Sequence, residues 1–94
     1  MNLGKAVKVC RTSQNLNQTI LAERAGISIS YLSLLERGKR DPNTSTIEAL
    51  SMALGIPVII LFFLAAEKKD LIGIEPELIE KLSYTTLKLI EAKG

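Results

Sequence analysis

Apolar residues recur along the chain at the spacing of amphipathic helices, and polar residues typical of helix ends separate the repeats. Leu3, Val7 and Cys10 follow an i, i+4, i+7 pattern, which predicts a first helix over residues 3–13. The residues between them are largely small or polar. Only one face of this helix is therefore expected to be buried.

Two short helices joined by a tight turn are predicted next. Asn17 is a good N-cap residue for a helix over 18–25, and Ser28 is one for a helix over 29–37. Gly26 lies between them and permits the positive φ that a tight turn needs. The two helices are expected to share an apolar seam made of Ile20, Leu21, Ala25, Ile27, Leu32 and Leu35.

The rest of the chain predicts three further helices. Asn43 caps a fourth helix that ends at Leu54, and residues 57–66 and 76–92 form a fifth and a sixth. No segment alternates apolar and polar residues with the period of two that marks a half-buried strand. The chain is therefore predicted to be all-α.

The fifth predicted helix contains an uninterrupted run of nine apolar residues, 58–66. A membrane span needs about 20 such residues, and this run ends in the charged sequence Glu67-Lys68-Lys69-Asp70. A buried helix is favoured over a membrane anchor. Residues 1–5 also lack the apolar core of a secretion signal, so we expect a cytoplasmic protein with no membrane partner.

Composition restricts the chemistry that the chain can perform. Its 94 residues fit one small domain, with a single cysteine and no histidine. This excludes a zinc-finger ligand set, an intramolecular disulfide and a histidine-based catalytic triad. Cys10 lies in an apolar stripe and is interpreted as a small core residue. We expect no enzyme, no metal and no cofactor.

The charge is distributed unevenly between the two halves of the chain. Residues 1–43 contain seven Lys and Arg against three Asp and Glu, whereas residues 44–94 contain five against seven. The first half is therefore the side expected to meet a polyanion such as nucleic acid.

One pattern of residues continues in register from the first predicted helix through the fourth. It consists of Leu3-Gly4 and Arg11, Asn17-Gln18, Leu21-Ala22, Gly26-Ile27-Ser28, Tyr31-Leu32-Ser33, Leu35-Glu36-Arg37-Gly38-Lys39-Arg40, Pro42, Ile47, Leu50 and Ala53-Leu54-Gly55-Ile56. With these residues, 3–64 resemble the phage-repressor and Cro-like helix-turn-helix family of transcription regulators, often called Xre-like. The resemblance implies a compact five-helix, lambda-repressor-like DNA-binding domain over residues 1–66, followed by a linker and a C-terminal helix in 67–94.

The family resemblance also implies how DNA would be contacted. In this family the third helix enters the major groove, while the starts of the second and fourth helices and the loop after the third contact phosphates. The base-facing residues would be Ser28, Ile29, Ser30, Tyr31, Ser33 and Leu34. The backbone contacts would be Gln18, Arg37, Lys39, Arg40 and Asn43. Arg11 and Glu36 correspond to a family ion pair that ties the first helix to the third.

Two apolar residues depart from the family pattern on the third helix. Ile29 and Leu34 stand where family members commonly have Arg, Lys or Gln, which read guanine and adenine with two hydrogen bonds. One interpretation is that they pack on thymine methyl groups while the serines make single hydrogen bonds. The other is that one or both face protein, or that DNA binding is weak or lost. Tyr31 either stacks on the sugar-phosphate backbone or covers the seam between the second and third helices.

The fifth helix is apolar on every face, which is more than a four-helix core can cover. The sixth helix presents a stripe that can cover it, either within the chain or from a twofold-related copy: Leu78, Ile79, Leu82, Thr86, Leu89 and Ile90. Readers of this kind bind two half-sites about 34 Å apart, so we expect a homodimer through residues 57–92. Residues 67–94 would then be the dimerisation element.

Together these observations predict a sequence-specific, dimeric regulator of transcription. It would act as a repressor on double-stranded DNA, reading the major groove with the helix at 28–37 and needing no cofactor. The alternative is the antitoxin of a toxin–antitoxin pair, with an apolar C-terminal part that binds a toxin while the front half still binds an operator. A stable protein partner from the native cell would distinguish the two.

Overall fold

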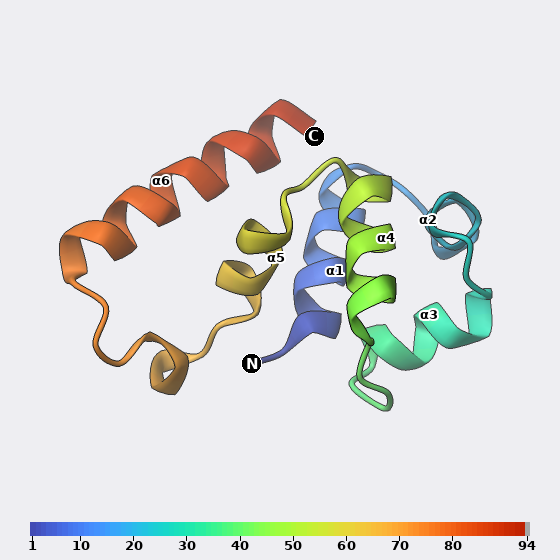
Figure 1. Ribbon diagram of the computed structural model, residues 1–94. Coiled ribbons are helices and arrows are strands. Elements are labelled where there is room, and N and C mark those ends of the chain that lie inside the picture. The colour runs from blue at the N-terminus through green and yellow to red at the C-terminus, as the bar shows by residue number, and fades with distance from the viewer. Residues whose placement is uncertain (94) are drawn as a thin grey trace.

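A computed structural model describes residues 1–93 as helices joined by short turns, with no strand in that range (Figure 1). Every predicted α-helix is present, and its ends differ from the predicted ones by no more than one residue. A short 3₁₀ turn in the segment after the fifth helix was not predicted. The elements are α1 (Leu3–Ser13), α2 (Gln18–Ala25), α3 (Ile29–Glu36), α4 (Thr44–Leu54), α5 (Val58–Ala65), η1 (Lys68–Leu71) and α6 (Pro76–Lys93).

Side-chain caps fix where three of these helices begin. The side chains of Asn17, Ser28 and Asn43 each accept a hydrogen bond from the backbone N–H three residues later, at 2.8, 3.0 and 2.9 Å. These bonds satisfy N–H groups that have no partner within the helix. Gly26 closes α2 with a φ of 69°. The predicted caps and the tight turn between α2 and α3 are thus confirmed.

The core lies where α1 to α5 meet. Its buried members are Val7, Cys10, Leu21, Ala22, Leu32, Leu35, Leu50, Leu54, Ile56, Ile60 and Leu61. Ile20 was wrongly predicted to share this seam, because its position on α2 leaves it 38% exposed. Cys10 is fully buried, and burial raises the pKa of its thiol. The thiol therefore stays neutral, as expected of a core residue.

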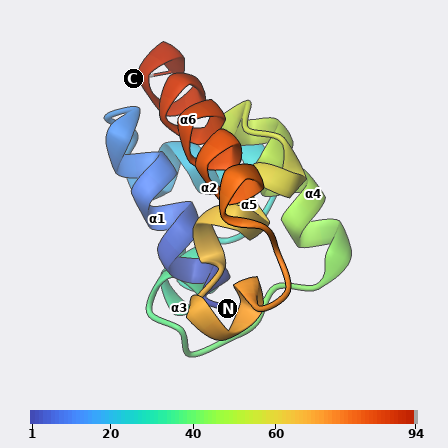
Figure 2. The same ribbon diagram turned by 90° about the vertical axis from the view of Figure 1, so that its left-hand side faces the viewer.

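Helix α6 lies across α5 and reaches α1 within the same chain (Figures 1 and 2). On α6, Thr86 is buried and Leu89 packs against the core cluster. Leu78 was predicted to lie on the covered stripe, but it is 50% exposed in the first turn of α6. The stripe on α6 is therefore used, at least in part, to cover α5 of its own chain.

No single helix within residues 1–93 is long and apolar enough to cross a membrane. Helices α4 and α5 reach that length and hydropathy only as a pair bent by 104°. On α5, Ile60, Leu61 and Ala65 are buried inside the protein. One face of this apolar helix is therefore buried in the core, as predicted.

The N-terminal end of α1 packs directly on the C-terminal end of α3. A Cβ atom placed on Gly4 would lie 1.8 Å from the carbonyl oxygen of Leu35, far inside any permitted contact. Glycine is therefore required here for a close approach of two helices and not for a special φ. This contact sets the distance between α1 and α3.

We expect Gly4→Ala to lower the free energy of unfolding by about 3 kcal/mol, because the added methyl group forces the two helices apart. Gly26→Ala is the matched control: it adds the same atom where no other atom lies within 4 Å, but at a φ of 69°. Its cost should be the smaller one of about 1 kcal/mol for a left-handed backbone. Urea unfolding measures both, and an equal or smaller loss for Gly4→Ala would contradict the close contact.

Candidate nucleic-acid interface

A shallow groove of about 420 Å³ lies between the start of α2 and the outer face of α3. It is lined by Gln18, Ile29, Ser30, Ser33, Leu34 and Arg37. The α3 residues among these lie on one side of the helix, because residues three and four positions apart share a face. The structure therefore brings together residues from both the predicted base-facing set and the predicted backbone set.

The two apolar residues of the predicted reading surface line this groove and do not fill the core. Ile29 is 46% exposed in the first turn of α3, and Leu34 is half-buried. Ser28 precedes them, and its hydroxyl oxygen accepts a hydrogen bond from the N–H of Tyr31. The interpretation in which Ile29 is withdrawn into the protein is thus wrong. Its apolar surface is available to a molecule in the groove.

Tyr31 covers the inside of α3 and does not project from it. Its ring is partly buried against the core cluster, and the guanidinium of Arg40 lies 5.8 Å from the ring centroid. This agrees with the interpretation in which Tyr31 covers the seam between α2 and α3. The cation–π contact also holds Arg40 near the end of α3 although the residue itself is exposed.

Three cations lie at the C-terminal end of α3 and in the loop that follows it: Arg37, Lys39 and Arg40. All three are exposed, and the Nε–H of Arg37 donates to the carbonyl of Ser33 at 3.3 Å. At the end of the same loop, the side chain of Asn43 caps α4 by accepting a hydrogen bond from the N–H of Thr46 at 2.9 Å. The loop therefore combines exposed positive side chains with a helix start, which is the combination that binds phosphate.

A buried ion pair lies behind the groove and joins α1 to α3. Arg11 donates to both carboxylate oxygens of Glu36, at 2.7 and 2.9 Å, and to the carbonyl of Leu16 at 2.8 Å. The side chains of Arg11 and Glu36 are only 11% and 2% exposed. The hydrogen bond to Glu36 raises the pKa of the Arg11 guanidinium. Gln18 donates to the same carboxylate at 3.1 Å, so α2 is tied to the pair as well.

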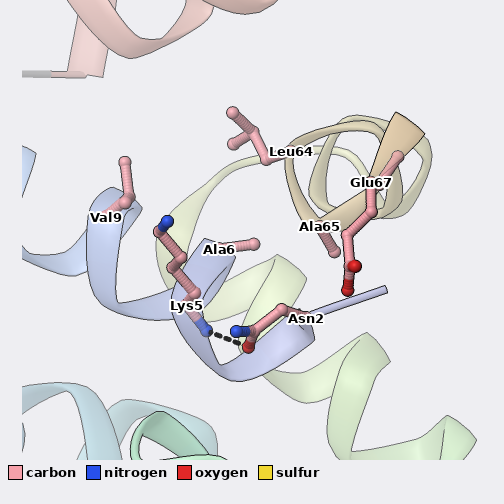
Figure 3. A pocket seen from close by; sticks show the side chains of 8 residues that line it. Asn2, Lys5, Ala6, Val9, Leu64, Ala65 and Glu67 are labelled. Atoms are coloured by element: carbon pink, nitrogen blue, oxygen red, sulfur yellow. Dashed lines mark hydrogen bonds between the residues drawn. The ribbon is translucent and has the colours of Figure 1, made fainter. Parts of the chain in front are cut away.

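A separate cavity of about 390 Å³ lies between α1 and the end of α5 (Figure 3). Lys5, Ala6 and Val9 line it from α1, opposite Leu64 and Glu67. Its lining mixes apolar side chains with a few polar groups, and Figure 3 shows Val9 on α1 and Leu64 on α5 among the side chains that line it. This cavity shares no lining residue with the groove on α3 and was not predicted from the sequence.

Comparison with known proteins identifies the family to which the chain belongs. A family model described as helix-turn-helix matches residues 7–61, more than half of the chain. The chain belongs to this helix-turn-helix family. The matched range begins in α1, contains the two helices and the tight turn that form the groove, and ends in α5.

Several helix-turn-helix relatives are similar to the same part of the chain. The immunity repressor protein of Bacillus phage phi105 is 45% identical over 58 residues, which are 62% of this chain and 40% of the relative. The transcriptional regulator ClgR of Mycobacterium tuberculosis is 29% identical over 66 residues, 70% of this chain and 59% of the relative. An uncharacterized HTH-type transcriptional regulator of Mycobacterium bovis is 39% identical over 54 residues, 57% and 21%. The chain therefore spans less than two thirds of the length of these relatives.

The sequence predicted only part of the role of Gln18. It was predicted as a contact to the DNA backbone, and in the structure its amide also donates to the Glu36 carboxylate. The two residues are 18 positions apart on different helices, so no spacing rule connects them. The predicted Arg11–Glu36 pair is confirmed, and it was found only because the resemblance names it.

We expect Arg11→Met to lower the free energy of unfolding by about 3–5 kcal/mol, because it leaves the buried carboxylate of Glu36 without its cation. The double variant Arg11→Met with Glu36→Leu should lose less than Arg11→Met alone, since no charge is then buried. Urea unfolding of the single and double variants measures this. A double variant that is as unstable as the single one would show that the pair's charges are not the cause.

Proposed function

We propose that the chain is a sequence-specific DNA-binding regulator of transcription that acts as a repressor. The observation that carries the proposal is the shallow groove on α3, together with the exposed Arg37, Lys39 and Arg40 at the end of that helix and in the loop after it. An exposed α-helix fits the major groove of B-DNA, and the cations beside it would neutralise phosphates of the DNA backbone. The relatives named as a repressor and as transcriptional regulators support the same function.

Contacts to the DNA backbone would come from three places around α3. The starts of α2 and α4, capped by Asn17 and Asn43, present backbone N–H groups and the positive end of a helix dipole. Gln18 stands at the first of these, with one amide hydrogen committed to Glu36 and one left to donate. The loop cations supply the third. This arrangement would fix the orientation of α3 while the groove side chains contact base edges.

The proposal includes a homodimer that forms through residues 57–92. Although α6 covers α5 within the chain, apolar side chains remain exposed nearby: Ile59 is 66% exposed and Leu78 is 50% exposed. An apolar gap of about 170 Å³ lies between α5 and α6, with Phe62 and Leu82 among its lining residues. A second copy could cover these groups, and residues 67–94 would then act as the dimerisation element beside the DNA-binding part at 1–66.

The experiment that tests this function is selection of bound duplexes from random DNA at a stated salt concentration. A dimeric repressor should select a palindrome with half-sites about one helical turn apart. A half-site without a symmetric partner would support DNA binding and contradict the dimer. Failure to enrich any sequence, together with no salt-dependent binding, would contradict the proposed function.

We expect Arg40→Ala to weaken binding to all DNA sequences alike, because its proposed contact is with a phosphate. The slope of log affinity against log salt should fall by about one unit for each phosphate that the variant no longer neutralises. Lys81→Ala is the control, since it removes the same charge from α6, far from α3 in Figure 1. Titrations at several salt concentrations measure both slopes. An unchanged slope for Arg40→Ala would remove this residue from the interface.

We expect Ile59→Glu to weaken association of the chain while leaving the fold of each copy intact. Ile59 is 66% exposed in the single chain, so a charge costs little there unless a second copy covers it. Covering it would bury an unpaired charge at a cost of several kcal/mol. Leu82→Glu is the contrast, because Leu82 is already half-buried and its change should destabilise the chain itself.

Sedimentation at micromolar concentration and thermal unfolding separate these two effects. Ile59→Glu should shift dimers to monomers, and at a concentration where the parent is also monomeric the two proteins should unfold at the same temperature. A parent protein that is monomeric at high concentration would contradict the dimer. Only α6 of the same chain would then cover the apolar surface of α5.

A further inference from the structure

The open face of α3 lacks the side chains that read guanine or adenine with two hydrogen bonds. Residues 28–35 contain no Arg, Lys, Asn or Gln. Glu36 at the end of the helix is 2% exposed and is bound by Arg11. Arg37 follows it, and its Nε–H already donates to the carbonyl of Ser33 at 3.3 Å. This bond leaves the other guanidinium N–H groups of Arg37 free, but Arg37 is the C-cap of α3. Within α3 itself, the polar side chains that line the groove are Ser30 and Ser33, whose hydroxyls make single hydrogen bonds.

Two apolar side chains border this polar strip. With 3.6 residues per turn, Ile29 and Leu34 lie about 140° apart around the helix axis, and Ser30 and Ser33 lie between them. All four line the same groove of about 420 Å³. Ile29 exposes 46% of its surface in the first turn of α3, the part of a recognition helix that meets base edges. Its β-branched side chain has few rotamers, so its shape is fixed before binding.

We propose that this face reads the C5-methyl group of pyrimidines in the major groove, which in unmodified DNA is the methyl group of thymine. Ile29 is the principal contact and Leu34 the second. Thymine presents a methyl group beside the O4 acceptor, so an apolar side chain and a neighbouring serine hydroxyl match it together. Burying the methyl group removes its surface and that of Ile29 from water. This inference rests on the proposed function, because it identifies what the same groove recognises.

The test uses the duplex selected from random DNA and the same duplex with one thymidine at a time replaced by deoxyuridine. Uracil keeps the base pair and the O4 acceptor and lacks only the methyl group. Loss of a buried methyl group should reduce affinity about fourfold at the contacted position. Unchanged affinity at every replaced position would overturn the proposal while leaving DNA binding itself intact.

A second set of duplexes distinguishes the two sources of the methyl group. The contacted thymine·adenine pair is replaced by cytosine·guanine, with and without a 5-methyl group on the cytosine. About a fourfold gain from the methyl group would support readout of the methyl group whichever base carries it. No gain, combined with the loss on uracil, would assign the readout to thymine with its O4 acceptor.

Variants assign the effect to named side chains. At the position that Ile29 contacts, Ile29→Ala should bind the thymine and uracil duplexes with equal affinity, whereas Ile29→Val should keep part of the preference. Met52→Ala is the control: Met52 is 84% exposed on α4, so the variant should keep the full fourfold difference. Leu34→Ala is compared in the same way after its fold is checked by circular dichroism. If both alanine variants keep the parent preference for thymine over uracil, the proposal is wrong.

Discussion

The close contact between α1 and α3 is the constraint on which the rest of the structure depends. Gly4 allows the two helices to approach until no side-chain atom fits between them, and the Arg11–Glu36 pair fixes their relative orientation with two short hydrogen bonds. One contact lies near each end of α1. Both contacts meet α3 at its last two residues, Leu35 and Glu36, so they fix the position of this end of α3 on α1.

The Glu36 carboxylate extends this constraint to the groove. It accepts from Arg11 on α1 and from Gln18 on α2, so three helices meet at one buried charge. Burying an ion pair adds little net stability, because desolvation offsets most of the attraction. What the pair supplies is geometry: the residues that line the groove from α2 and α3 are held in one arrangement. The proposed reading surface would use single hydrogen bonds and apolar contacts, and it needs such fixed geometry because each contact is weak.

The helices and their caps could be predicted from the sequence because their causes are local. Asn17, Ser28 and Asn43 act on N–H groups three residues away, and helical periodicity needs no knowledge of distant contacts. The groove residues also follow from helix spacing once the family resemblance places α3. The Gln18–Glu36 bond does not follow, because it joins residues that only the packing of α2 on α3 brings together. The η1 turn is similar: its start depends on a bond from the Glu67 N–H to the Asp70 carboxylate, which holds the pKa of Asp70 low, in a segment with no periodic signal.

The position of α6 shows why an apolar pattern predicts burial but not the partner that provides it. Its stripe and the apolar α5 are complementary whichever copy supplies them, and within the chain they do meet. The fit is incomplete, since Leu78 and Ile59 stay exposed and an apolar gap remains between α5 and α6. An 18-residue helix that buries so little of its own surface is held weakly compared with α1 to α5, whose contacts form the core. The proposed reading face on α3 is thus held by packing against α1 and α2, whereas the exposed apolar surface on α5 and α6 is what the proposed dimer would cover.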